Sequence, residues 1–505
     1  MKQSPYAELA SRFHRLGTLR EAAQMLHWDR QAMMPEGGAA ARSEQMATLR
    51  VVVHEHLIHP AMPDLLDGAE AENALDDWQR ANVREMRRQW LHATAVPSDL
   101  VAALSNAASE CGMVWRKARP GNDFAMILPS FQRLLELVRE VAAAKAARLG
   151  KSPYEALLDQ WEPDGSTVEI DRQFDRLGTG LPGMIDAALE RQARSSAPLS
   201  LPGPFPIEAQ RQAGLRLMER LGFEFTHGRL DVSLHPFCGG TPDDVRITTR
   251  YDEADFTRSL MGVLHETGHA LYQRGLPEAW RRQPVGSARG MSVHESQSLL
   301  IEMQVCRSRE FLAFAAPLLR ECFGRDGDDP AAWHPDNLYR LYTRVERSLI
   351  RVDADEVTYP AHVILRYRLE RAMIAGELAP SDLPLAWEDG MRALIGIVPP
   401  DDRQGCLQDV HWYDGAWGYF PTYTLGAMTA AQLFDAAKRA DAAIVPGIAS
   451  GNFAPLLAWL RANVHGLASR FSSAELIARA SGRTLDAGVF ERHLRRRYID
   501  PDDVH

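Results

Sequence analysis

A His-Glu-x-x-His motif at residues 265–269 contains the residue types that metal-dependent hydrolysis requires. On a helix, His265 and His269 would lie on one face and could bind one Zn²⁺ together. A bound zinc ion lowers the pKa of its water ligand to about 7, and Glu266 is placed to accept that proton. The alternative is an ordinary helix with two solvated histidines. We favour the catalytic metal site.

A catalytic zinc site also needs a third protein ligand and an open fourth position. Glu295, 26 residues after His269, is the best candidate, at the start of a second helix predicted from about residue 294. Two histidines and one glutamate form the thermolysin-like ligand set. A first-turn glutamate is also favoured by the helix dipole alone, and Glu302 is the alternative ligand. Because Leu299 stands four residues after Glu295, where some zinc peptidases carry an acid, other groups must orient the histidines.

The elements on either side of the motif can be predicted from local signals. The motif helix should begin near residue 253, since Asp252 and Asp255 can serve as N-cap and first-turn anions. Segments 223–237 and 245–251 are rich in β-branched and aromatic residues and are bordered by Gly and Pro. They predict a small hairpin or sheet immediately before the motif helix.

The rest of the chain predicts a mainly α-helical fold. Residues 1–160 repeat apolar positions at helical spacing with few internal Gly or Pro, whereas 195–206 contains four prolines and cannot be helical. We expect a single unit over 1–505, with possible subdomains at 1–200, a helical scaffold, and 201–505, the catalytic part.

Composition limits the classes of partner and the compartment. The 57 basic and 67 acidic side chains give a net charge of −10, which argues against nucleic acid as a ligand. Five scattered cysteines without Cys-x-x-Cys spacing indicate reduced, buried thiols instead of disulfides or a thiolate zinc site. We find neither a signal-peptide pattern nor an apolar run approaching 18 residues, so we expect a cytosolic protein without membrane contact.

The motif residues also occur in a recognisable combination. The segments 265–277 and 294–298 resemble the HExxH metallocarboxypeptidases typified by thermostable (Taq-type) carboxypeptidase. The similarity extends over nearly the whole chain. It includes His235-Pro-Phe, Asp244-x-Arg-x-Thr248, Ile350-Arg-x-x-Ala-Asp355, Gly405-x-x-Gln-Asp-x-His-Trp412, Trp28-Asp29, Met34-Pro35 and the segment 474–482.

This resemblance implies a neurolysin-like, multi-helix fold with a deep groove, a catalytic Zn²⁺ or Co²⁺ at its floor, and a homodimer. It implies removal of single C-terminal residues from peptides, with His265, His269 and Glu295 as ligands and Glu266 as base. In this family the motif around Arg351 is associated with closing the groove and limiting substrate length.

A carboxypeptidase must recognise a terminal carboxylate, and an arginine can do so with two parallel hydrogen bonds. Arg351 and Arg246 are the candidates. Each could equally form a structural ion pair, Arg246 with Asp244 and Arg351 with Asp353 or Asp355.

The tetrahedral intermediate needs a hydrogen-bond donor besides the metal. His411, Tyr419 and Tyr423 could supply it, although aromatic residues in a Gly-rich segment are often packed core. His235 could form a wall of the substrate site or be a buried histidine with satisfied hydrogen bonds.

Two further pairs of residues carry weaker signals. Trp28 and Asp29 fit a core aromatic and an ion-paired or capping acid. Cys238 and Cys406 lie in family motifs, and a thiol near the metal would make the enzyme sensitive to oxidation or excess metal.

The leading hypothesis is a cytosolic metallocarboxypeptidase in which Glu266 acts as base and then as acid. One alternative is an endo-oligopeptidase or dipeptidase with the same metal site. Another is a non-catalytic, metal-stabilised peptide-binding protein, which the presence of Glu266 disfavours.

Overall fold

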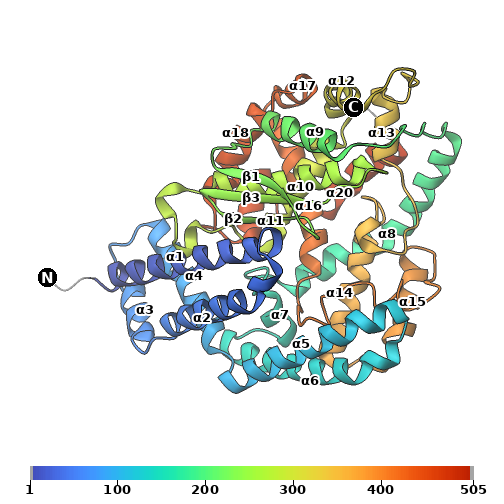
Figure 1. The fold of residues 1–505 in the computed structure, drawn as a ribbon. Coiled ribbons are helices and arrows are strands. Elements are labelled where there is room, and N and C mark those ends of the chain that lie inside the picture. The colour runs from blue at the N-terminus through green and yellow to red at the C-terminus, as the bar shows by residue number, and fades with distance from the viewer. Residues whose placement is uncertain (1–3, 501–505) are drawn as a thin grey trace.

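The computed structural model describes residues 4–500, and helices make up most of it (Figure 1). Before β1 the regular secondary structure is all helical, as the sequence predicts for residues 1–160, and the proline-containing segment 195–206 is not helical, also as predicted. Its helices are α1 (Pro5–Ala32), α2 (Ala39–Leu57), α3 (Met62–Glu70), α4 (Asp77–Thr94), α5 (Ser98–Gly121), α6 (Phe124–Leu149), α7 (Pro153–Leu158), α8 (Thr167–Arg194) and α9 (Ile207–Arg220).

The remaining helices follow the small sheet. They are α10 (Phe256–Gly275), α11 (Met291–Leu299), α12 (Arg309–Phe323), α13 (Pro335–Tyr342), α14 (Tyr359–Ala375), α15 (Leu383–Leu394), α16 (Pro421–Ala440), α17 (Ile444–Ser450), α18 (Ala454–Asn463), α19 (Ser473–Ser481) and α20 (Ala487–Leu494). A π-helical segment, η4 (Leu300–Cys306), continues directly from α11.

Local sequence signals explain several helix boundaries. Pro35 separates α1 from α2, with a short 3-10 turn, η1 (Glu36–Gly38), between them. Asp76 and Gln79 form a capping box at the start of α4, in which each side chain accepts from the other's backbone N–H. Gly150, at φ 66°, ends α6 in the left-handed conformation that glycine adopts without strain.

The sheet has three strands in the order β1-β3-β2, with β1 (Gly228–Val232), β2 (Phe237–Thr241) and β3 (Asp244–Thr249). The predicted small sheet is present, but the two predicted segments, 223–237 and 245–251, contain β1 and β3, which pair in parallel. The hairpin is formed instead by β2 and β3, and most of β2 lies outside the predicted segments. Ile247 in the central strand pairs with Leu230 on one side and Cys238 on the other. In Figure 1 the sheet lies between α9 and the N-terminal helix α1, which contacts β2.

Apolar residues pack into three clusters. The largest spans both sides of residue 200, from Cys111 to Tyr498, and contains the buried faces of α6, α8, α14 and α16. A second cluster joins α1, α3 and α4. The third lies between the sheet and α10, where Val245 and Ile247 pack with Val263 and Ala270. The motif helix α10 is thus packed against the sheet through buried apolar side chains.

Among residues 4–500, no helix is both long and apolar enough to cross a membrane.

Candidate functional site

The motif helix α10 begins at Phe256, three residues later than the predicted position near 253. Asp255 is its N-cap, because the carboxylate accepts a hydrogen bond from the backbone N–H of Thr257 at 2.8 Å. Asp252 instead accepts from Ala254 N at 2.9 Å in the preceding turn. The prediction that both acids act on the helix was therefore wrong for Asp252.

The structure brings His265, His269 and Glu295 together. Their potential ligand atoms all lie within 4.8 Å of one another. The Nε2 of His269 is 3.4 Å from Glu295 Oε2, and the Nε2 of His265 is 3.9 Å from Glu295 Oε1. Helix α11 begins at Met291, earlier than predicted, so Glu295 lies beyond the first turn. The helix-dipole explanation of Glu295 is therefore weakened.

Two glycines allow the helices around this cluster to approach closely. A Cβ at Gly268 of α10 would lie 2.5 Å from the backbone oxygen of Gln297 in α11. A Cβ at Gly426 of α16 would lie 2.9 Å from the Cβ of Glu295. Both distances are shorter than real Cβ contacts, so only glycine fits there. α11 is thereby packed tightly between α10 and α16.

The second nitrogen of each histidine is also bonded. His265 Nδ1 lies 2.9 Å from Glu302 Oε2, and His269 Nδ1 lies 3.1 Å from the backbone oxygen of His294. Arg307 Nη2 donates to the other oxygen of Glu302 at 2.5 Å. Glu302 therefore contacts the ring nitrogen that faces away from Glu295. It is placed to orient His265, and its geometry does not support the alternative role of ligand.

Electrostatics at the cluster suit a cation. Burial by itself lowers the pKa of His265, but Glu295, Glu302 and Glu266 outweigh that effect and raise it to about 10. Burial likewise raises the pKa of Glu295, while His265 and His269 lower it to about 2. Buried carboxylates next to two imidazoles form a nitrogen and oxygen donor set of the kind that divalent metal ions prefer. The residues present therefore fit such an ion.

A second cluster surrounds Arg351 and corrects its predicted ion pair. Arg351 is buried and donates from Nη2 and Nε to Asp409 at 2.8 and 3.2 Å, and not to Asp353 or Asp355. Arg366 donates to the same carboxylate at 2.6 Å from Nε. One carboxylate between two guanidinium groups leaves a net positive charge at this place. Because buried charges need partners, Asp409 holds both arginines.

Asp353 and Asp355, the two alternative ion-pair partners of Arg351, have other partners. Asp353 accepts from Arg258 at 2.9 Å on the surface. Asp355 accepts hydrogen bonds from the backbone N–H groups of Val357 and Thr358 at the approach to α14. Their side chains therefore shape the chain around Arg351 without neutralising it.

His411, Tyr419 and Tyr423 lie together next to Arg351. The Tyr423 hydroxyl is 3.5 Å from His411 Nε2, and the Arg351 guanidinium lies 4.9 Å from the centre of the Tyr423 ring. The ring of Tyr419 stacks on His411 at 5.9 Å. Burial lowers the pKa of His411 to about 4, so the imidazole is neutral near pH 7. Tyr423 precedes Gly426 by one helical turn, which places this cluster next to Glu295.

Arg246 lies in the central strand β3 of the sheet. It donates two hydrogen bonds to Asp244, at 2.9 and 2.7 Å, and its guanidinium lies 4.4 Å from the centre of the Trp28 ring. Trp28 is buried, and Asp29 pairs with Arg42 at 2.5 Å. The structural interpretations of Arg246, Trp28 and Asp29 are therefore supported by direct contacts.

His235 and two of the cysteines are more exposed than a buried position would require. His235 is exposed between β1 and β2, so it is not a buried histidine. All five cysteines are unpaired among the residues that the structure describes, but Cys238 and Cys322 are only half-buried. Burial, followed by the nearby charge of Glu266, raises the pKa of Cys238. Cys406 Sγ faces Asp402 at 3.9 Å.

Sequence reasoning missed Arg366 and left Asp409 without a role. Asp409 lies inside the GxxQDxHW motif, but nothing local indicates that its partners are 58 and 43 residues earlier. A usable signal for Arg366 is its position directly after the mostly apolar stretch Ala361–Leu365, because a charge inside a buried helix face requires a partner.

The sequence profile of the family Carboxypeptidase Taq (M32) metallopeptidase matches residues 8–498. Thermostable carboxypeptidase 1 of Thermus thermophilus is 39% identical over 482 residues, which cover 93% of this chain and 94% of that protein. The structure of Trypanosoma cruzi metallocarboxypeptidase 1 superposes with a TM-score of 0.95 at 40% identity, covering 98% of this chain and 99% of that chain. The M32 carboxypeptidase from Deinococcus radiodurans superposes with a TM-score of 0.92 at 34% identity, covering 98% of each chain.

Proposed function

The chain belongs to the carboxypeptidase Taq (M32) metallopeptidase family and is a metal-dependent carboxypeptidase, and we propose that the clusters around Glu295 and Arg351 form its active site. The observation that carries this proposal is the approach of His265, His269 and Glu295 ligand atoms to within 4.8 Å. The reaction releases single C-terminal amino acids from peptides.

His265, His269 and Glu295 would hold the metal ion. We propose Zn²⁺, with Co²⁺ as an ion that accepts the same ligands. When bound, the ion acts as a Lewis acid and makes a water molecule a nucleophile near neutral pH. Glu266, the residue after His265, accepts the proton of the attacking water and returns it to the leaving amine.

Arg351 is the better candidate for the substrate carboxylate. Asp409 occupies its Nε and Nη2, while Nη1 has only a 3.4 Å contact with the Tyr359 hydroxyl. The excess positive charge of Arg351, Arg366 and Asp409 favours an anionic group at this place. His411 and Tyr423 stand beside it and are the candidate donors to the tetrahedral intermediate. Arg246 and His235 have no such neighbours among residues 4–500, and we retain them only as secondary candidates for substrate contact.

A pair of peptides that differ only at the C-terminus tests this assignment. We expect the free-acid peptide to lose its last residue and the C-terminally amidated peptide to be cleaved at least about 100-fold more slowly, because a charged hydrogen bond with a buried arginine is lost. The measurement is kcat/KM by mass spectrometry of the released residue. Equal cleavage of both peptides would instead favour an endo-oligopeptidase with the same metal site.

Glu302→Gln tests the orientation of His265. Removing the negative charge opposite Nδ1 should weaken metal binding about 10-fold or more, with the protein still folded. The measurement is metal loss in competition with a graded chelator. Glu36→Gln, at an exposed position in η1, is the matched control and should leave the metal affinity unchanged. Equal metal affinity in wild type and Glu302→Gln would contradict the positioning role.

The proposed assembly rests on the family resemblance alone. We propose a cytoplasmic homodimer in which residues 1–505 form one metallocarboxypeptidase unit. The unit is supported by the large apolar cluster that crosses residue 200.

A further inference from the structure

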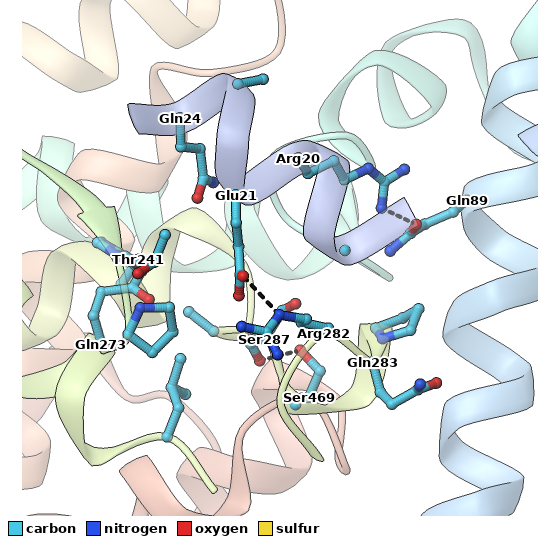
Figure 2. Close-up of a pocket in the computed structure, with 18 of the residues that line it drawn as sticks. Arg20, Glu21, Gln24, Gln89, Thr241, Gln273, Arg282, Gln283, Ser287 and Ser469 are labelled. Carbon is cyan, nitrogen blue, oxygen red and sulfur yellow. Dashed lines mark hydrogen bonds and ion pairs between the residues drawn. The ribbon is translucent and has the colours of Figure 1, made fainter. Parts of the chain in front are cut away.

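A large cavity, here called the basic cavity, adjoins the predicted metal cluster. Its volume is about 1040 Å³, and its walls come from α1, α2, the edge strand β2 and the loop that precedes α11. His294, next to Glu295 in sequence, and Gln273, one turn after His269, both line it. Figure 2 shows side chains from α1, β2 and the loop at 282–287 facing one another across it. The cavity thus extends from the metal helices to the N-terminal helices.

Positive charge predominates among the residues that line the cavity. The lining includes six arginines but a single carboxylate, Glu21. Three of the arginines are neutralised: Glu21 pairs with Arg282 at 2.7 Å, and carboxylates behind the wall pair with Arg88 and Arg289. Figure 2 shows the Glu21–Arg282 pair inside the cavity. The remaining arginines are Arg20, Arg50 and Arg281.

These three arginines have unused capacity for an anion. Arg20 is half-buried and donates to the neutral side chain of Gln89 at 2.7 Å, a contact that Figure 2 also shows. Neither Arg20 nor Arg50 has a carboxylate within 4.0 Å in the part of the chain from 4 to 500. Arg281 has one long contact, 3.5 Å, with Asp243, while its buried Nε and Nη1 have no acceptor among the described residues.

Buried donors without an acceptor are costly, and unneutralised guanidinium groups in a partly enclosed space attract carboxylates. We propose that the basic cavity binds an acidic side chain, Asp or Glu, located upstream of the C-terminal residue in the peptide substrate. The cavity would make the enzyme selective for peptides with an acidic residue at a defined distance from the cleaved bond. This proposal rests on the carboxypeptidase function and on the assigned metal centre.

The position of the metal cluster relative to the cavity determines which peptide residues can reach the arginines. Glu266 and Glu295 do not line the cavity, but His294 and Gln273 do, so a peptide with its last bond at Glu266 reaches the cavity if it continues past His294. An extended chain advances about 3.3–3.6 Å per residue, so only certain positions bring a side chain opposite Arg20 or Arg50. The preference for an acidic residue should therefore depend on the position of that residue in the peptide. It should also fall as the salt concentration rises, because exposed charges are screened.

The test uses the metal-loaded enzyme and alanine-based peptides that share one C-terminal residue. A single glutamate is moved one position at a time along the peptide, and each peptide is matched by one with glutamine at that position. We expect the ratio of kcat/KM for Glu over Gln to reach about tenfold at one or two adjacent positions and to stay near one elsewhere. The all-alanine peptide separately measures the carboxypeptidase activity on a substrate without an acidic residue. If it is cleaved normally and no position favours glutamate, the proposal is wrong and the carboxypeptidase function stands.

Variants assign the preference to the cavity. Arg50→Gln removes an exposed side chain without an ion pair, so the fold should tolerate it, and Arg20→Gln removes the deeper guanidinium. Each should lower the Glu/Gln ratio at least threefold while the all-alanine peptide is cleaved as before. Arg15→Gln, an equal loss of charge at an exposed position of the same helix outside the cavity, is the control and should keep the ratio. If Arg20→Gln and Arg50→Gln both keep the wild-type Glu/Gln ratio, the assignment of the preference to this cavity is wrong.

Discussion

Glu266→Gln should reduce kcat/KM for release of a C-terminal residue by about 10²- to 10⁴-fold and leave the bound metal in place. The substitution keeps the size of the side chain and removes its ability to accept a proton. Glu266 is buried beside the candidate ligands but is not one of them. Metal content by elemental analysis and release of the last residue from a free-acid peptide are the two measurements.

The control for this result is His269→Ala, which removes a predicted ligand. It should lose the metal and the activity together, whereas Glu266→Gln loses activity alone. If Glu266→Gln hydrolyses peptides at the wild-type rate, Glu266 is not the base. If it loses the metal as His269→Ala does, its role is structural.

The motif helix α10 could be predicted from sequence because the residues that indicate it lie close together in the chain. The spacing of His265 and His269 fixes both on one face of any helix, and the cap residue Asp255 lies nearby in sequence. The error in the helix start came from Asp252 and Asp255, which are both typical capping residues. Only the backbone conformation decides which of the two bonds to the first turn. The prediction of Glu295 required a second helix, whose approach to α10 depends on Gly268.

Partners that lie far away in sequence could not be predicted in the same way. The alternative role of Arg351, a structural ion pair, was assigned to an acid two or four residues away, but its partner Asp409 is 58 residues further along. Nothing in a single sequence indicates which buried arginine meets which carboxylate when several are available. The same holds for Glu302, whose side chain reaches His265 from the π-helical segment η4. Such segments change the register of side chains within a helix and are common at functional sites.

Asp409→Asn should destabilise the protein by about 3–5 kcal/mol, since it leaves the buried guanidinium groups of Arg351 and Arg366 without a counter-charge. The asparagine oxygen can still accept one hydrogen bond, so the lower end of this range is expected. The measurement is the free energy of unfolding in denaturant at pH 7. Asp353→Asn is the matched control, because Asp353 pairs with Arg258 on the surface. It should cost less than about 1 kcal/mol.

The pH dependence gives this prediction a second, independent readout. Burial raises the pKa of Asp409, but Arg366 and Arg351 outweigh burial and hold it well below its usual value. A carboxyl group with a lowered pKa stabilises the folded state above its ordinary pKa of about 3.9 and loses that contribution as the pH falls further. The difference in stability between wild type and Asp409→Asn should thus be constant from about pH 5 to 8 and shrink below pH 4. A difference that does not change with pH would mean that Asp409 stabilises the fold by packing and hydrogen bonding, without its charge.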